Sequence, residues 1–385
     1  MIKVLSLFSG IGAFERALCR IGLDWELVNY CEIDRYASQS YSMINQCSDS
    51  LNLHDVRAVT AETVRDCHVD LITYGFPCQD ISIAGKQQGF VNNSGEPTRS
   101  GLFFDALRII KELQPRYAIA ENVKALTSKK FKNEFTTVLS SLEDAGYNNY
   151  WSVLNAKDYG IPQNRERVFI VSIRKDADEG DFQFPDKEPL MLRLRDMLEP
   201  TESVDEKYYL STEREGVRRL IADLEQRYTL PVVAQIGETP VLCQIGNIAK
   251  DPNREHIQDR IYDPSGIAAS LIATDYKEPP QISVIGQLKG GEKGRVIDRD
   301  GISYTITATE YKDPLKIAEP GNTRTVRIRK LTPRECWRLM GFMDEEFDRV
   351  HGISNSQLYK QAGNSIVVNV LSALLTQLFN KTERD

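Results

Sequence analysis

Three observations predict the fold class. It is an α/β domain with a mostly parallel sheet, joined to a smaller strand-rich domain. Short apolar strands alternate with helices over the first 175 residues. The composition then changes at the acidic, proline-bearing stretch 176–191, which predicts a domain boundary. Beyond it, residues 260–282 realign with residues 295–317 at a constant offset of 35, which predicts two related β-hairpin units.

The strands of the first domain are expected where short apolar runs end at polar or turn residues. These runs cover residues 3–9, 26–34, 70–76, 117–123 and 167–173. Helices are expected between them, because Phe14, Ala17 and Leu18 recur at the spacing of one helical face. Further helices are expected from Ser100 onward and over residues 133–146.

Near the C-terminus, residues 356–379 begin as a loop and end as an amphipathic helix. The apolar stripe of that helix needs a sheet face to cover. We therefore expect this segment to return to the first domain.

Composition places the chain among soluble globular proteins. Its 385 residues, 41% of them apolar, suffice for two domains. Seven cysteines without a CxxC pair argue against a disulfide framework or a zinc site and favour a reducing cytoplasm. The chain has no apolar run of about 20 residues, the length of a membrane span, and it starts directly with a strand instead of a signal peptide.

The charge distribution is more informative than the net charge of −7, which argues weakly against a nucleic-acid partner. Residues 322–338 carry six basic side chains against one acid, Glu335. Most basic runs are solvated surfaces, but this density makes the segment a candidate for phosphate contacts.

A glycine turn lies at "LFSGIGAFE", residues 7–15, between the first strand and its helix. Such a turn presents backbone N–H groups to a ligand or serves only helix packing. The dinucleotide pattern would need glycine where Glu15 stands, and a carboxylate there disfavours a diphosphate. Glu32, placed 22 residues after Gly10, suits ribose hydroxyls, so a nucleoside cofactor without a diphosphate, such as S-adenosylmethionine, is favoured.

Two strand ends carry candidate catalytic groups. Cys78 follows Pro77 just past a strand end, where open α/β sheets bind their ligands. Because free cysteine is usually a small buried hydrophobe, position alone leaves nucleophile and structural residue both open. Glu121 ends an apolar strand, so burial would raise its pKa toward that of a proton donor, although a carboxylate that balances a helix dipole is the common alternative.

Two arginines alternate with other residues in "QNRERV". Alternate strand positions face one side, so Arg165 and Arg167 are expected to point into one space. Such an arrangement suits an anion or an extruded base. The four histidines show no metal-ligand spacing, and no metal site is expected.

Six motifs in order reveal a family resemblance: "FSGIGAF", "GFPCQDIS", "ENV", "QNRERV", "RKLTPRECWRLMGF" and "YKQAGNSIVVNV". The chain resembles DNA (cytosine-5)-methyltransferases of the bacterial and phage restriction–modification type. The resemblance implies a Rossmann-like, S-adenosylmethionine-dependent methyltransferase domain at 1–178, completed by 340–385. A smaller target-recognition domain at 179–325 and a basic connection at 326–339 follow from the same resemblance.

The resemblance also assigns roles by motif. Cys78 matches the nucleophile that adds to C6 of cytosine, and Glu121 matches the acid at N3, while Arg165 and Arg167 match the arginines that hold the base. The implied cofactor-binding positions are Phe8, Gly10, Gly12, Glu32, Asp55, Pro77, Leu102, Asn364 and Ser365. Two positions depart from the family: Ser6 replaces a usual Asp, and Ile33 a frequent Trp.

The implied reaction requires the cytosine to leave the duplex, because C6 cannot be reached inside the base stack. Residues 79–99 are then expected to form a lid over the DNA. Within it Lys86 is expected at a phosphate, and Gln87 or Gln88 in the space that the base leaves.

Sequence readout is expected from the repeat. Equivalent positions in the two copies are Thr274 and Thr309, and Tyr276 and Tyr311. For any single one a scaffold role is favoured over a base contact, because Thr and Tyr are good strand residues and phosphate contacts outnumber base contacts. The basic segment adds Arg324 and Arg327 as expected phosphate contacts.

Three other functions compete with a methyltransferase acting on duplex DNA. A transfer-RNA cytosine-5 methyltransferase is expected to lack a repeated recognition unit of this length. A DNA-binding relative without catalysis is disfavoured because Cys78, Glu121 and Arg165 are all present. A nicotinamide-dependent oxidoreductase is disfavoured by Glu15. The enzyme is expected to act as a monomer in the cytoplasm of a bacterial or phage-infected cell; the sequence leaves open whether a separate cognate restriction endonuclease exists.

Overall fold

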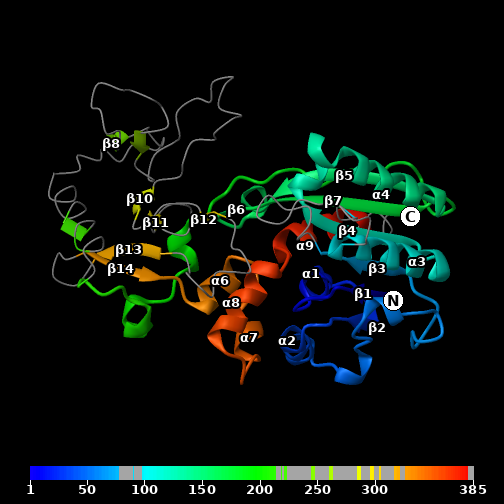
Figure 1. Cartoon of the computed structure of the whole chain (residues 1–385), viewed down its shortest axis with the longest axis horizontal. Helices are drawn as coiled ribbons and strands as arrows, with labels where there is room; N and C mark the ends of the chain where they lie inside the picture. Colours follow the sequence, from blue (N-terminus) through cyan, green and yellow to red (C-terminus); the bar gives the residue numbers. More distant parts are fainter. Residues whose placement is uncertain are drawn as a thin grey trace.

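The computed structural model describes most of the first domain and parts of the second (Figure 1). The described residues are 1–77, 90, 98–213, 218, 221–222, 244–247, 260–262, 284–287, 295–298, 303–304, 316–320 and 326–379. Figure 1 shows the large sheet with its helices at one end of the long axis and β13 and β14 at the other, with α6, α7 and α8 between them.

The large sheet has six strands in the order β2-β1-β3-β4-β7-β5. Their bounds are β1 Ile2–Leu7, β2 Trp25–Cys31, β3 Leu71–Tyr74, β4 Tyr117–Val123, β5 Tyr147–Asn155 and β7 Glu166–Arg174. Strands β1 to β4 are parallel, whereas β7 runs antiparallel to both β4 and β5. The mostly parallel sheet predicted from the sequence is confirmed.

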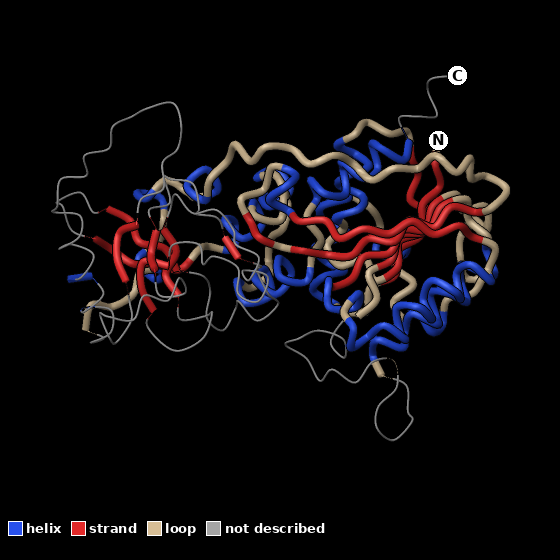
Figure 2. Tube along the Cα trace, turned by 90° about the horizontal axis from the view of Figure 1, so that it is seen from above, coloured by secondary structure: helices blue, strands red, loops and turns tan. Residues whose placement is uncertain are grey.

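Helices cover both faces of this sheet (Figure 2). Helices α1, Ala13–Arg20, α2, Arg35–Asn45, and α9, Val368–Phe379, pack into the core on one face. Helices α3, Phe103–Leu113, and α4, Lys132–Asp144, pack into a second core on the other. The α/β class follows from these two apolar cores.

Local sequence explains where several of these elements begin. Asp34 caps α2 by accepting hydrogen bonds from the backbone N–H groups of Tyr36 and Ala37. Helix α4 buries Phe135, Val138 and Leu142 at helical spacing. The sequence patterns did not predict β5, which is an edge strand and pairs with β7 over its whole length.

The C-terminal segment lies against the first domain. It contains α6, Pro333–Arg338, α7, Asp344–Asp348, α8, Asn355–Asn364, and α9. Helix α9 packs against α1 in the same core. Among the described residues, Asn355–Phe379 is the one stretch long and apolar enough to cross a membrane, but it is mostly buried in this core.

The described strands of the second part form smaller sheets. Their bounds are β8 Gln244–Asn247, β9 Arg260–Tyr262, β10 Val284–Gln287, β11 Arg295–Asp298, β12 Ser303–Tyr304, β13 Lys316–Pro320 and β14 Val326–Lys330. Strand β9 pairs antiparallel with β8, and β11 pairs antiparallel with β10. Strands β9 and β11 open the two copies of the repeat, so the copies begin with equivalent strand pairs. Each pair has a register irregularity, before Gly246 in one and Gly286 in the other.

The two parts also meet through a strand pair. Strand β12 pairs in parallel with β6, Gln163–Asn164, and the Ser303 N–H donates to the Pro162 carbonyl at 2.7 Å. The segment expected as a basic connection contains β14, an edge strand of the sheet β10-β11-β13-β14, followed by α6.

Candidate active site

The predicted catalytic residues in the described chain gather at the carboxyl ends of β3 and β4. Tyr74 at the end of β3 pairs with Ala120 of β4, which places Glu121 beside Gly75. A Cβ atom added at Gly75 would lie 3.7 Å from Oε2 of Glu121. The carboxyl group of Glu121 therefore lies over the chain segment that leads to Pro77.

Glu121 forms an ion pair with Arg167 of the neighbouring strand β7. The distance from Oε1 of Glu121 to Nε of Arg167 is 3.1 Å, and the two side chains are 12% and 16% exposed. Burial raises the pKa of Glu121, while the charges of Arg167 and Arg165 oppose that rise. The pKa of this carboxyl group is thus displaced in the direction that favours a proton donor.

Arg165 is buried and belongs to the same region. Its guanidinium group donates to the carbonyls of Gly363 at 3.2 Å and Ser365 at 2.7 Å, so it fixes the turn that follows α8. Its backbone N–H donates to Oδ1 of Asn155 at 3.0 Å. Arg165 and Arg167 line one small cavity, as the alternation in the sequence predicts, but their hydrogen bonds go to different partners.

The backbone that leads to Cys78 is held from two sides. Asn122 donates through Nδ2 to the Phe76 carbonyl at 3.0 Å, and the Ser100 hydroxyl donates to the Pro77 carbonyl at 2.8 Å. The Phe76 ring also packs against Phe103 with ring centroids 5.4 Å apart. Cys78 itself lies outside the described residues. The sequence patterns assigned no role to Asn122 or Ser100, because one asparagine and one serine near strand ends are common turn residues.

The two glycines of the glycine turn have different surroundings. Gly12, at φ 87°, touches α2 so closely that an added Cβ would lie 2.4 Å from Nδ2 of Asn45. Gly10, at φ 57°, has no atom within 4 Å of such a Cβ, so its α-carbon faces open space. Gly12 is therefore needed for packing, and Gly10 leaves room for a ligand.

Glu32 lies directly after β2 and faces this turn. Its Oε2 accepts from the Gly10 N–H at 2.9 Å, and its Oε1 accepts from the Asp34 N–H at 2.7 Å. Burial raises the pKa of Glu32, although both N–H groups favour the charged form. Each carboxylate oxygen retains capacity for a second donor.

Glu15, used in the sequence to argue against a diphosphate, is completely buried in the first turn of α1. Its polar neighbours are Ser6 and Tyr41, and burial raises its pKa. A dinucleotide site is therefore disfavoured by the missing third glycine more than by a surface charge.

The remaining predicted cofactor residues have different surroundings. Both carboxylate oxygens of Asp55 bind the guanidinium group of Arg57, which lowers the pKa of Asp55. Leu102 is partly buried against the core of α3. Asn364 is exposed at the end of α8, and Ser365 is buried next to it.

The sequence as a whole decides the family. A family model described as C-5 cytosine-specific DNA methylase matches residues 2–380. The chain belongs to this family. It is a DNA (cytosine-5)-methyltransferase, and its substrate is cytosine in DNA.

Similar methyltransferases occur in bacteria and phages. The chain is 37% identical to type II methyltransferase M2.ScrFI of Lactococcus lactis subsp. cremoris, over 98% of this chain and 99% of that protein. It is 33% identical to type II methyltransferase M.HhaI of Haemophilus parahaemolyticus, over 96% of this chain and 92% of that protein. It is 32% identical to the orphan methyltransferase M.SPBetaI of Bacillus phage SPbeta, over 98% of each.

Solved structures share the methyltransferase fold. A putative DNA modification methyltransferase encoded within an Escherichia coli prophage superposes with a TM-score of 0.60 at 21% identity, over 99% of each chain. The Schizosaccharomyces pombe Dnmt2 methyltransferase superposes with a TM-score of 0.61 at 19% identity, over 100% of each chain. These two similarities concern the fold alone.

Over its described residues, 326–338, the basic segment forms ion pairs within the methyltransferase. Arg327 binds Glu206 at 2.6 Å and lies 3.6 Å from the ring centre of Tyr209. Arg329 is fully buried and binds Glu335 at 2.8 Å. Arg334 and Arg338 pair with the acids Asp348 and Asp344. The segment is therefore less basic toward solvent than its sequence indicates.

The predicted DNA contacts fall mostly outside the described residues. Arg327 is the one such residue in the described chain, and its contact with DNA stays a prediction. The others lie outside the described residues: Lys86, Gln87, Gln88, Thr274, Tyr276, Thr309, Tyr311 and Arg324.

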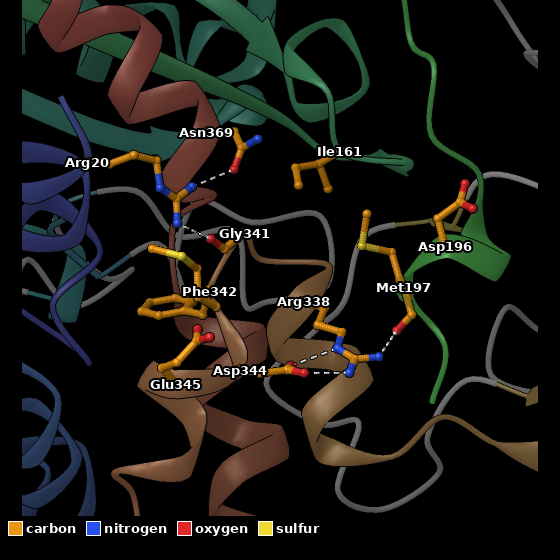
Figure 3. A pocket seen from close by; sticks show the side chains of 11 residues that line it. Arg20, Ile161, Asp196, Met197, Arg338, Gly341, Phe342, Asp344, Glu345 and Asn369 are labelled. Atoms are coloured by element: carbon orange, nitrogen blue, oxygen red, sulfur yellow. Dashed lines mark hydrogen bonds and ion pairs between the residues drawn. The ribbon is translucent and has the colours of Figure 1, made fainter. Parts of the chain in front are cut away.

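A separate surface hollow of about 430 Å³ lies where α1, α6 and the start of α9 approach one another (Figure 3). Arg20 crosses it, donating to Oδ1 of Asn369 at 2.9 Å and to the Gly341 carbonyl at 2.7 Å. Arg338 lines it and binds Asp344. None of the predicted catalytic or cofactor residues lines this hollow.

Proposed function

We propose that this enzyme transfers a methyl group from S-adenosylmethionine to C5 of a cytosine extruded from a specific duplex DNA sequence, with a covalent bond between Cys78 and C6. The observation that supports the proposal most strongly is the Glu121–Arg167 pair beside the anchored backbone of Phe76 and Pro77. A buried acid and a nucleophile on adjacent strand ends suit a planar base entering between them.

The residues at the glycine turn fit an adenosine-type cofactor. Gly10 leaves open space, and both oxygens of Glu32 retain acceptor capacity for ribose hydroxyls. Ile33 is 71% exposed next to Glu32, which suits an apolar cover for a base. When bound there, S-adenosylmethionine supplies the methyl group.

The chain's own residues would act on the cytosine. The protonated carboxyl of Glu121 holds N3 and donates to it as the Cys78 thiolate adds to C6, which makes C5 electron-rich. After C5 has taken the methyl group, a base removes the C5 proton. Elimination of the thiolate then restores the C5=C6 double bond, and the N3 proton returns to the Glu121 carboxylate. Arg167 keeps Glu121 in place, and Arg165 fixes the turn at Ser365.

The partners follow from this reaction. Duplex DNA is the proposed substrate, and the enzyme is proposed to act as a monomer in the cytoplasm. A cognate restriction endonuclease, where one exists, would act separately.

A trapping experiment tests the proposal. The enzyme is incubated with labelled S-adenosylmethionine and either duplex DNA or tRNA, and with duplex DNA carrying 5-fluorocytosine at the target. We expect label on DNA and a denaturation-stable adduct that Cys78→Ser does not form. Label on tRNA alone would overturn the substrate, and an adduct with Cys78→Ser would overturn the nucleophile.

A further inference from the structure

Asn52 makes four hydrogen bonds through a buried side-chain amide. Its Oδ1 accepts from the backbone N–H groups of Glu32 at 3.0 Å and His54 at 2.8 Å. Its Nδ2 donates to the Glu32 carbonyl at 3.0 Å and to the Ser38 hydroxyl at 2.8 Å. The residue is 6% exposed. An amide has two donors and two acceptor positions, so every one of them is used.

Two of these bonds hold both backbone polar groups of one residue, Glu32. Strand β2 is the edge strand, and its pairing with β1 ends at Cys31, so Glu32 lies just beyond the ladder. The chain around Asn52 runs along the outer side of β2, with a bridge to Tyr30 and a 2.8 Å bond from the Leu53 N–H to the Tyr30 carbonyl. The Asn52 side chain thus pairs with Glu32 as a neighbouring strand would.

This arrangement fixes the direction of the Glu32 carboxylate. The backbone of Glu32 is held by Asn52. The two oxygens of the Glu32 carboxylate then accept from different N–H groups, Oε2 from Gly10 and Oε1 from Asp34. A carboxylate held in this way needs no reordering when ribose hydroxyls arrive, which lowers the cost of binding.

We propose that Asn52 is a positioning residue for the cofactor: it holds Glu32 in the orientation that receives the ribose of S-adenosylmethionine. The proposal rests on the proposed function, in which Glu32 binds that ribose. Asn52 itself touches neither the substrate nor the reacting atoms. The sequence gives little sign of this role, because an asparagine between two short segments is typical of a turn.

Two substitutions separate this role from packing. Asn52→Asp keeps the size and the acceptor but places a carboxylate oxygen against the Glu32 carbonyl, so the contact becomes repulsive. Ser38→Ala, the matched control, removes one bond to Asn52 and leaves both bonds to Glu32 intact. Binding of S-adenosylhomocysteine to the full-length protein without DNA is measured by calorimetry, beside the melting temperature and kcat at saturating cofactor.

We expect Asn52→Asp to weaken S-adenosylhomocysteine binding at least tenfold, with kcat within about threefold of the wild type, and Ser38→Ala to change binding less than twofold. The decisive measurement is a double-mutant cycle. In a Glu32→Ala background, Asn52→Asp should cause no further loss of affinity, whereas damage to the fold alone would add to the loss. Additive losses, or equal losses in Asn52→Asp and Ser38→Ala, would overturn the positioning role. If the wild-type protein binds no S-adenosylhomocysteine, the proposed function itself is wrong.

Discussion

The Glu121 carboxylate and the Arg167 guanidinium meet at 3.1 Å across adjacent antiparallel strands, where both side chains are largely buried. Burial raises the pKa of Glu121, and the arginine opposes the rise. The balance between the two sets the pH range in which the carboxyl group holds a proton. Since the proposed mechanism needs that proton, the pair should govern the pH dependence of turnover.

Replacing Arg167 by methionine tests this relationship. Because the charge of Arg167 lowers the pKa of Glu121, its loss lets that pKa rise further. Because activity falls where Glu121 loses its proton, the alkaline limb of the kcat profile should move to higher pH. Arg167→Lys keeps a positive charge and should shift that limb much less. If the alkaline limb of Arg167→Met lay at the same pH as that of Arg167→Lys, the proposed effect of the Arg167 charge on Glu121 would be contradicted.

Glu121→Gln should lower kcat by about 10²–10⁴-fold, because an amide cannot transfer a proton to N3. Binding of S-adenosylhomocysteine should stay within about twofold, since Glu121 is not placed among the cofactor residues. Glu166→Gln is the control: this exposed carboxylate pairs with Lys124 nearby, and its loss should leave turnover nearly unchanged. Rapid-quench rates and calorimetry distinguish the outcomes. A lost cofactor affinity in Glu121→Gln would argue for a different role.

Asn122→Ala should destabilise the fold and slow catalysis together. It leaves the buried Phe76 carbonyl without its 3.0 Å donor, which costs about 1–3 kcal/mol. The freed backbone precedes Pro77 and the predicted nucleophile, so kcat should fall more than cofactor affinity. Urea unfolding and single-turnover rates measure the two effects. The exposed Asn133→Ala should change neither, and an unchanged kcat in Asn122→Ala would show that this anchor is not needed.

The edge of the sheet where these residues meet was predictable, because parallel strands must end at one edge and Glu121 closes an apolar run. The side-chain pairings there were not. Arg329 looks like a surface charge in a basic run, yet the fold buries it beside Glu335. Strand β5 escaped prediction because its sequence, YNNYWSVLN, mixes polar and aromatic residues without the alternation of a strand, and its order comes from the pairing with β7. The burial of Arg329 and the formation of β5 depend on partners in other segments of the chain. Local sequence patterns do not identify those partners.

Two arginines of β14 should differ sharply in their effect on stability. Arg329→Met leaves the buried Glu335 carboxylate uncompensated and should cost about 3–5 kcal/mol of unfolding free energy. Arg327→Met, two residues away, removes a partly exposed pair with Glu206 and should cost about 0–1 kcal/mol. Urea denaturation of both variants tests the contrast. Equal losses would mean that burial of the Arg329 pair has no energetic consequence.

Glu15→Gln should stabilise the protein increasingly as pH rises. Burial raises the pKa of Glu15 in the folded state, so the wild type favours the neutral acid when folded, while the unfolded chain ionises above about pH 4.3. Between those two pKa values each unit of pH costs the wild type up to about 1.4 kcal/mol, and glutamine avoids this cost. The melting temperature of the variant should therefore exceed that of the wild type at pH 8, and the gap should close toward pH 4. The raised pKa values of Glu32 and Glu121 affect both proteins alike and cancel in the difference. A gap that widens toward acid pH would mean that Glu15 is ionised and paired in the fold.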